Sequence, residues 1–173
     1  MQKEKLTVET IHKTIFRLHG SDMEEQGRIT YTGNDFFKAD MIVTESFLLI
    51  CTGTGVWHII NKKAVENRKP VAVIKVKPGT LISIKLECRK KKYNFRKSAG
   101  WKLRFLLLDQ DGDEMLSILP SINWEKESHN YILQLNEEFE EECDPFLILQ
   151  AVHCANVSMS MLTGGKVPAL INI

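Results

Sequence analysis

The residues best suited to chemistry in this chain form a basic and aromatic cluster, RKKKYNFRK, from Arg89 to Lys97. Every position in it except Asn94 is cationic or aromatic. Lysine and arginine attract anions, while Tyr93 and Phe95 are suited to stacking on nucleic-acid bases or inserting at a lipid interface. The competing interpretation is a charged hairpin that keeps a sheet edge soluble. We predict an anion-binding surface within residues 85–104, with these members: Lys85, Arg89, Lys90, Lys91, Lys92, Tyr93, Phe95, Arg96, Lys97, Lys102 and Arg104.

The distribution of charge along the chain supports such a surface. The net charge of +1 hides three unequal parts. Residues 61–104 hold fifteen Lys or Arg against two acids, whereas residues 105–173 hold two Lys against twelve acids, and residues 1–60 hold six against eight. A basic stretch of this density indicates an anionic partner such as phospholipid or nucleic acid. Alternatively, basic and acidic strands lie side by side and neutralise each other across the fold.

An acidic turn from Asp109 to Glu114 invites a calcium interpretation. Its aspartates occupy loop positions 1, 3 and 5 of an EF-hand pattern, but position 6 is Glu114 instead of glycine and position 12 is Pro120 instead of an acid. The flanking segments also have the pattern of strands. We therefore predict a hairpin turn here, and no metal site.

Catalytic motifs are missing from the sequence. It contains no GxSxG, HExxH or P-loop pattern, and its five histidines are scattered without metal-ligand spacing. His153 and Cys154 are adjacent on an apolar segment, where a packed, hydrogen-bonded histidine is expected instead of a catalytic dyad. We expect neither enzymatic activity nor a cofactor.

The elements that must position the basic cluster are mostly short strands. Residues 1–20 are ambiguous between strand and helix, and residues 20–28 have the composition of a loop. Alternating or continuous apolar patterns separated by turn residues then predict successive hairpins. The predicted strands cover residues 29–32, 41–44, 47–51, 56–61, 71–76, 81–88, 93–95, 101–108, 115–119 and 131–135, with a polar connection over 120–130 and one more strand over 167–173.

One helix follows the strands. Residues 146–162, FLILQAVHCANVSMSML, carry no formal charge and are too many for an ordinary strand. Asp144 is suited to the N-cap and Pro145 to the first helical position. The segment is short for a membrane span, and Gln150, His153 and Asn156 recur on one side of it. Protein groups can satisfy such side chains and lipid cannot, so we predict a helix enclosed by a strand barrel.

The order of these elements resembles the tubby C-terminal superfamily, which includes the phospholipid scramblases and the LURP-one-related proteins. The resemblance is greatest in WKLRFLLLDQDGDEMLSILP, residues 101–120, and in LNEEFEEECDPFLILQAVHCANVSMSML, residues 135–162. It implies a single domain over residues 1–173, in which an antiparallel barrel of about ten to twelve strands surrounds the helix. It also implies a basic patch on the barrel, which holds phosphoinositide headgroups in the tubby branch. The scramblases' cysteine cluster, proline-rich N-terminus and long final helix have no counterpart here, so lipid scrambling is not expected.

These observations together lead to a functional expectation. The chain is expected to be a cytoplasmic, non-enzymatic binding or adaptor module without a transmembrane span. It would bind an anionic phospholipid surface, as a peripheral membrane protein, or a protein partner through the basic region. The alternative is a nucleic-acid-binding protein that uses the same cluster. The four cysteines form no CxxC pair and are expected to be buried free thiols in a reducing compartment.

Overall fold

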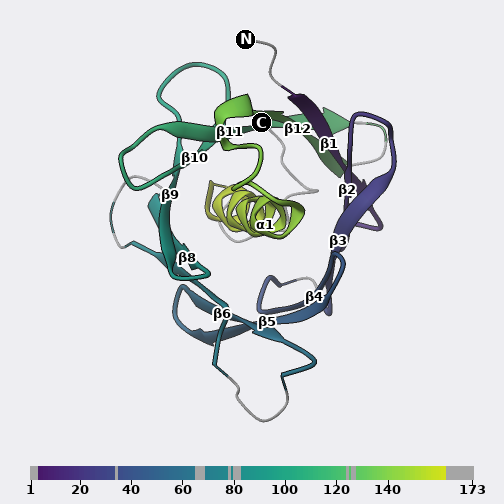
Figure 1. Ribbon diagram of the computed structural model, residues 1–173. Helices are drawn as coiled ribbons and strands as arrows, with labels where there is room; N and C mark the ends of the chain where they lie inside the picture. The colour runs from purple at the N-terminus through teal and green to yellow at the C-terminus, as the bar shows by residue number, and fades with distance from the viewer. Residues whose placement is uncertain are drawn as a thin grey trace.

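In a computed structural model, the chain forms a closed antiparallel barrel of twelve strands around one helix (Figure 1). The structure describes residues 4–33, 35–64, 69–77, 79, 83–123, 125 and 128–162. Each strand pairs with the next one along the chain, and β1 pairs with β12 to close the ring. The strands are β1 (Glu4–Ile11), β2 (Ile15–His19), β3 (Glu25–Tyr31), β4 (Lys38–Ile42), β5 (Ser46–Gly53), β6 (Val56–Asn61), β7 (Ala72–Val76), β8 (Ser83–Cys88), β9 (Lys91–Lys97), β10 (Phe105–Leu108), β11 (Glu114–Asn123) and β12 (Ser128–Leu135).

The helix α1 (Pro145–Leu162) follows the short 3-10 helix η1 (Glu137–Phe139) and runs through the centre of the ring. The N-cap and the first residue of α1 are those that the sequence predicts. The Asp144 Oδ1 atom accepts a hydrogen bond from the Leu147 amide at 2.9 Å, and Pro145 occupies the first helical position. Phe146, next in the chain, stacks on Phe47 of β5 with ring centroids 4.1 Å apart.

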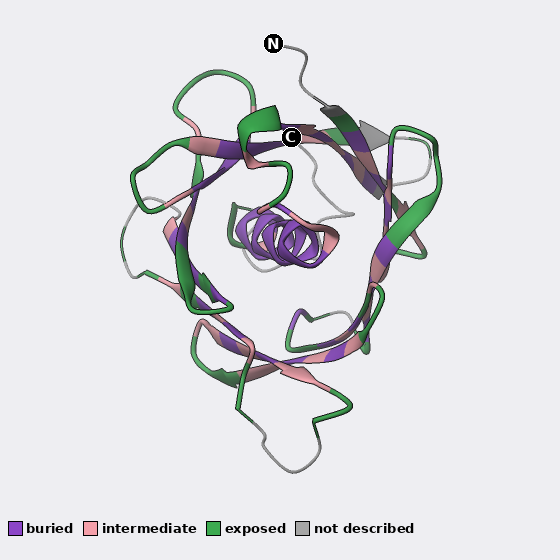
Figure 2. Cartoon of the chain, in the orientation of Figure 1, coloured by how far each residue is buried: buried purple, intermediate pink, exposed green. Residues whose placement is uncertain are grey.

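The surroundings of α1 decide between a membrane helix and a core helix. By length and composition α1 could cross a membrane, with a mean hydropathy of 1.3, but 78% of it is buried inside the protein. Figure 2 shows the buried helix within a wall in which buried residues alternate with intermediate or exposed ones. The buried residues of the strands and of α1 form one hydrophobic core. The predicted fold, a strand barrel around an apolar helix, is therefore confirmed.

The predicted polar stripe on α1 forms a buried hydrogen-bond network. The Tyr31 hydroxyl lies 2.8 Å from His153 Nδ1 and accepts a hydrogen bond from Asn156 Nδ2 at 3.1 Å. The Tyr131 hydroxyl donates to Asn156 Oδ1 at 2.7 Å. Gln150 donates to the Cys88 sulfur and to the Phe146 carbonyl. His153 is thus a packed core histidine, as the sequence predicts, with Trp57 edge-on to its ring.

Because consecutive antiparallel strands are joined alternately at the two ends of a barrel, the connections divide into two groups. We call the end where α1 begins the helix-entry end, and it carries the connections after the even-numbered strands. The opposite, helix-exit end carries the connections after the odd-numbered strands. Contacts along α1 agree with this assignment, since Phe47 at the start of β5 meets Phe146 and Tyr31 at the end of β3 meets His153.

The predicted loop over residues 20–28 is partly wrong, because β3 begins at Glu25. Gly27 and the charged residues beside it are typical of a loop, but Gly27 faces α1 inside the barrel. A Cβ atom at this position would lie 2.9 Å from the Ile42 carbonyl oxygen and 3.1 Å from Leu149 Cδ1. The nearest atom of all would be Val43 Cγ1, at 2.8 Å. The glycine therefore makes room both for the connection between β4 and β5 and for the helix, beside an irregularity in the pairing of β3 with β2.

Three other predicted boundaries also need correction. The strand expected from Trp101 begins only at Phe105, and Trp101 lies fully exposed in the preceding loop. The polar connection expected over residues 120–130 is shorter, since β11 continues through Pro120 to Asn123 and β12 starts at Ser128. Pro120 pairs with Tyr131, and the pairing continues to Asn123 and Ser128. The hairpin of β11 and β12 therefore includes proline and polar residues that were predicted to lie in the connection. The strand predicted over 167–173 lies outside the described residues.

Candidate anion-binding surface

The predicted basic cluster lies on the hairpin of β8 and β9, and the alternation of these strands divides it between two sides of the wall. Tyr93 and Phe95 point into the barrel, with 5% and 0% of their surfaces exposed. Lys92 and Arg96 point outward from the same strand. The two aromatic side chains are therefore unavailable for stacking on bases or inserting into lipid, which corrects their assignment to the binding surface.

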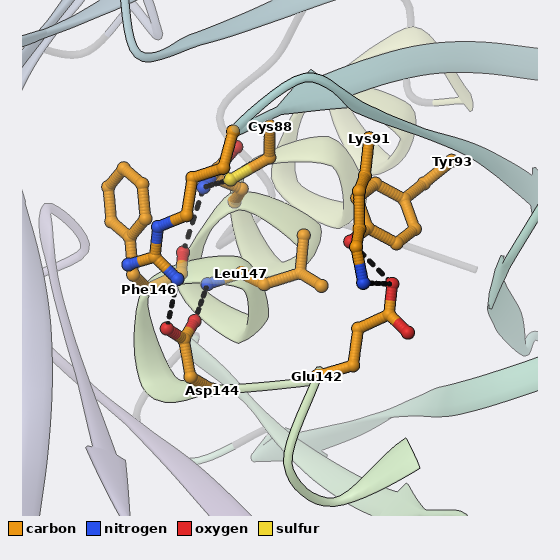
Figure 3. A network of polar contacts seen from close by, with 9 residues as sticks. Cys88, Lys91, Tyr93, Glu142, Asp144, Phe146 and Leu147 are labelled. Atoms are coloured by element: carbon orange, nitrogen blue, oxygen red, sulfur yellow. Dashed lines mark hydrogen bonds and ion pairs between the residues drawn. The ribbon is translucent and has the colours of Figure 1, made fainter.

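The turn between β8 and β9 lies at the helix-entry end, beside the acidic segment that leads into α1. Arg89 forms an ion pair with Asp144 at 2.5 Å, and its guanidinium carbon lies 5.2 Å from the centre of the Phe146 ring. Lys91 forms an ion pair with Glu142 at 3.1 Å (Figure 3). Two of the predicted cations therefore hold the hairpin to the start of the helix.

The side chains around this turn have shifted pKa values. The hydrogen bond to Asp144 raises the pKa of Arg89 above its usual value. Burial raises the pKa of Tyr93, and the hydrogen bond that its hydroxyl donates to Glu142 raises it further. Burial likewise raises the pKa of the Cys88 thiol. The tyrosine and the cysteine are therefore neutral near pH 7, and neither is activated as a base or a nucleophile.

A hollow of about 460 Å³ lies on the outer wall over β7, β8 and β9. Three exposed lysines line it: Lys75, Lys85 and Lys92. Lys75 and Lys85 are directly opposite each other in the register of β7 and β8, and Glu87 is opposite Lys92 in that of β8 and β9. None of these three lysines is within ion-pair distance of an acid in the described part of the chain.

Two neutral polar residues also line the hollow, together with Val73, Leu86 and Tyr93. Asn94 is opposite Lys85 on the outer face, and Gln110 reaches the hollow from the connection between β10 and β11. The arrangement can attract an anion through the lysines and donate hydrogen bonds from the two amides. The three lysines carry a charge of +3, and Glu87, which lines the same hollow, lowers the net charge of the lining to +2.

Lys75, Asn94 and Gln110 were missed as site residues by sequence reasoning. The signal for Lys75 was present, because the alternation over residues 71–76 and 81–88 places Lys75 and Lys85 on the exposed faces of two consecutive strands. Pairing them across the two strands requires the register, which the sequence does not state. Gln110 was assigned only to a turn, and that hairpin turn is confirmed by the Asp109 carboxylate, which accepts hydrogen bonds from the Asp111 and Asp113 amides.

The remaining predicted cations lie toward the helix-exit end. Arg96 and Lys97 finish β9 and are exposed, and Lys102 is exposed in the loop between β9 and β10. Arg104 extends along the outside of β10 to an ion pair with Glu114 at 2.5 Å. Lys90 is exposed in the turn between β8 and β9 at the opposite end. The barrel thus spreads the predicted cluster from one end of the wall to the other.

The two ends of the barrel differ in charge. Among the described residues, the connections at the helix-entry end and the strand ends bordering them are rich in acids: Asp22, Glu24, Glu25, Glu45, Asp109, Asp111, Asp113, Glu114, Glu137, Glu138, Glu140, Glu141, Glu142 and Asp144. The corresponding cations are Lys62, Lys63, Lys69, Arg89, Lys90 and Lys91. At the helix-exit end the described charges are Lys13, Lys38, Lys77, Lys97, Lys102 and Arg104 against Asp35 and Glu125. Basic and acidic parts of the chain therefore meet at the helix-entry end, while the wall and the helix-exit end keep an excess of cations.

The expectation of buried free thiols is met by three of the four cysteines. All four are free, with Cys88, Cys143 and Cys154 buried and Cys51 partly buried.

Comparisons with models of protein families, with curated protein sequences and with solved structures found no match to this chain. The closed barrel with its central helix resembles the tubby-like fold in architecture.

Proposed function

We propose that this chain is a non-enzymatic, cytoplasmic binding module of the tubby-like kind that binds anionic phospholipid surfaces. The observation that supports the proposal most is the hollow on the outer wall with Lys75, Lys85 and Lys92 around it. Among the described residues, no acid lies within ion-pair distance of these lysines, in contrast to Arg89 and Lys91, whose charges are paired with acids.

The register adds an energetic argument. Like charges directly opposite each other on one face of a sheet destabilise the pair. Lys75 and Lys85 are in this position, and Lys92 is diagonal to Lys85 on the next strand. A bound phosphate group would relieve this repulsion and replace it with charge-assisted hydrogen bonds.

The nucleic-acid alternative has less support. Its stacking residues were Tyr93 and Phe95, and both point into the barrel. Lysines alone would still give weak, salt-sensitive binding to nucleic acid. A phosphate-bearing lipid headgroup requires no aromatic stacking, so it suits the exposed side chains better.

Liposome co-sedimentation tests the proposal. The protein is expected to bind vesicles of phosphatidylcholine with phosphatidylserine or a phosphoinositide, and to leave vesicles of phosphatidylcholine alone unbound. The triple substitution of Lys75, Lys85 and Lys92 to Glu is expected to weaken binding to the anionic vesicles at least about tenfold, since each cation near an anionic surface contributes roughly 1 kcal/mol.

A matched control substitutes Lys5, Lys63 and Lys69 to Glu, which changes the net charge equally at exposed positions away from the hollow. The control is expected to retain most of the binding. Equal loss in both triple variants would show that net charge alone drives association. No binding of the unsubstituted protein to any anionic vesicle would rule out the lipid function.

A further inference from the structure

We propose that the helix-exit end of the barrel is the face that contacts the lipid interface, with Trp101 and Phe37 as its aromatic anchors. This inference rests on the proposed function and adds to it the orientation of the protein and the side chains that enter the membrane. It concerns residues outside the predicted basic cluster.

The exposed apolar side chains are unequally distributed between the two ends. Among the described residues, the large apolar side chains that are exposed are Met23, Phe37, Ile42, Trp101, Met161 and Leu162. Phe37 lies in the connection between β3 and β4, Trp101 in that between β9 and β10, and Met161 and Leu162 in the last turn of α1. These four share the helix-exit end, whereas Met23 and Ile42 lie at the helix-entry end.

Trp101 is the most exposed of these residues, at 105% of its reference surface. Its loop is closed at the base by a hydrogen bond from the Ser98 amide to the Arg104 carbonyl at 2.7 Å, and Gly100 has a φ of 133°. Lys97 and Lys102 are exposed in the same segment. A tryptophan between lysines is typical of a protein segment at a membrane interface, where the ring lies at headgroup level and the cations meet anionic lipid.

The connection between β3 and β4 repeats this combination. Phe37 is 59% exposed and Lys38 follows it directly. The loop is fixed from inside, because Trp57 Nε1 donates to the Phe36 carbonyl at 2.7 Å and the Cys51 amide donates to the Phe37 carbonyl at 2.7 Å. Phe36 is buried against Tyr31. The fixed backbone thus presents Phe37 to solvent, which reduces the entropy lost when this side chain is bound.

The two aromatic loops and the end of α1 lie at the same end of the barrel, where one flat surface can contact all three. The order of the strands places the β3–β4 connection and the β9–β10 connection six strands apart in a ring of twelve, on opposite sides of the barrel (Figure 1). The end of α1, with Met161 and Leu162 each 47% exposed, lies between them at the same end of the barrel. A flat bilayer can therefore meet both aromatic loops and the helix end at once.

The charges agree with this orientation. The helix-exit end has more cations than acids among its described residues, and the acids concentrate at the opposite end. Lys75 and Lys85 lie toward the helix-exit end on their strands. Their ammonium groups can therefore reach lipid headgroups beside the inserted loops of Phe37 and Trp101. An anionic leaflet would attract this end and repel the other.

The test compares two double variants on vesicles of phosphatidylcholine with phosphatidylserine. Phe37→Ser with Trp101→Ser is expected to weaken partitioning about tenfold or more, because two exposed aromatic groups lose their burial in the interface. Met23→Ser with Ile42→Ser removes exposed apolar side chains from the helix-entry end and is expected to leave partitioning unchanged. All four side chains are exposed, so both variants are expected to keep the thermal unfolding midpoint of the parent, which is measured beside the binding.

Fluorescence provides an independent reading of Trp101. The difference between the parent and Trp101→Phe isolates its emission from that of Trp57, which is 5% exposed, and of Trp124. Lipids with brominated acyl chains are expected to quench this difference signal when phosphatidylserine is included. Absence of quenching, unchanged partitioning of the Phe37 and Trp101 variant, or equal loss in the Met23 and Ile42 variant would each overturn the orientation.

The outcomes separate the two proposals. If substitution of Lys75, Lys85 and Lys92 weakens binding but substitution of Phe37 and Trp101 does not, the lipid function remains and the orientation is wrong. If the parent binds no anionic vesicle, both proposals fall.

Discussion

The backbone at Arg89 and Lys90 adopts the left-handed conformation, with φ values of 50° and 67°. This conformation suits a tight hairpin between twisted strands, where Asn-Gly is usual. Arg89 compensates through its contacts with Asp144 and Phe146, but the exposed Lys90 side chain makes no comparable contact in the described structure.

Lys90→Gly is therefore expected to stabilise the protein. Glycine removes the steric cost of the left-handed conformation, and after its larger entropy loss on folding a gain of about 0.5–1 kcal/mol remains. Urea denaturation measures the change. Lys90→Ala serves as the control, because it removes the same charge and keeps the Cβ atom, and a gain of equal size in this variant would contradict the backbone explanation.

Asp144 combines two roles at the start of α1, as the N-cap of the helix and as the partner of Arg89. Asp144→Ala is expected to lower the free energy of unfolding by about 1–2 kcal/mol through the lost cap. Asp144→Asn keeps an acceptor for the Leu147 amide and is expected to cost less than about 0.5 kcal/mol, because the exposed ion pair contributes little. Thermal or chemical denaturation of the two variants distinguishes the roles, and similar losses in both would assign the stabilisation to the ion pair.

At the scale of elements, the contact between α1 and the strands brings a titratable group into the core. His153 is completely buried, and desolvation lowers its pKa from 6.5 to about 3. A histidine with a lowered pKa in the folded state binds a proton more readily in the unfolded state. Its neutral form favours folding above pH 6.5, and this contribution declines as the pH falls from 6.5 toward 3.

Lowering the pH from 7 to 5 is therefore expected to cost the parent protein about 2 kcal/mol more than it costs His153→Gln, which has no imidazole to protonate. Urea denaturation at the two pH values, compared between parent and variant, isolates this contribution from that of the carboxylates. An identical pH dependence in the two proteins would show that His153 is protonated without unfolding.

The elements were largely predictable from the sequence, and their arrangement in space was not. The uncharged run from Phe146 to Leu162 and the Asp144–Pro145 start fixed the helix, and alternation fixed most strands. Local composition failed at Gly27, where the reason for a glycine is the close approach of Ile42, Val43 and Leu149, none of which is near it in the chain. It also failed at Trp101, because an apolar residue beside an apolar strand looks like part of that strand.

The prediction of the candidate site from the sequence failed for a related reason. The cluster from Arg89 to Lys97 is continuous in sequence, but a strand directs successive side chains to opposite faces, so Tyr93 and Phe95 belong to the core. The hairpin turn also carries Arg89 and Lys91 to an acidic segment about fifty residues further along the chain. Register and strand order, which follow from the closed ring, decide which charges remain free.

At the scale of the whole molecule, α1 supplies much of the core that the strands enclose. A chain that ends at Asp144 keeps all twelve strands but loses the side chains that fill the barrel. The transfer of these apolar groups out of water is a large part of the folding free energy.

The shortened chain is therefore expected to lose the cooperative unfolding transition and the near-ultraviolet circular dichroism of the parent protein. Size-exclusion chromatography and calorimetry measure the result. A monomeric, cooperatively unfolding chain without α1 would show that the strands close by themselves.

The order of elements along the chain also has a consequence for biosynthesis. A ribosome makes the twelve strands before α1, so the inward side chains of each new strand meet no helix to cover them during translation. The edges of β1 and β12 likewise remain unpaired until the ring closes. The nascent chain thus carries exposed apolar surface and open strand edges until residues 145–162 emerge, and we expect it to be prone to aggregation and to bind chaperones over this interval.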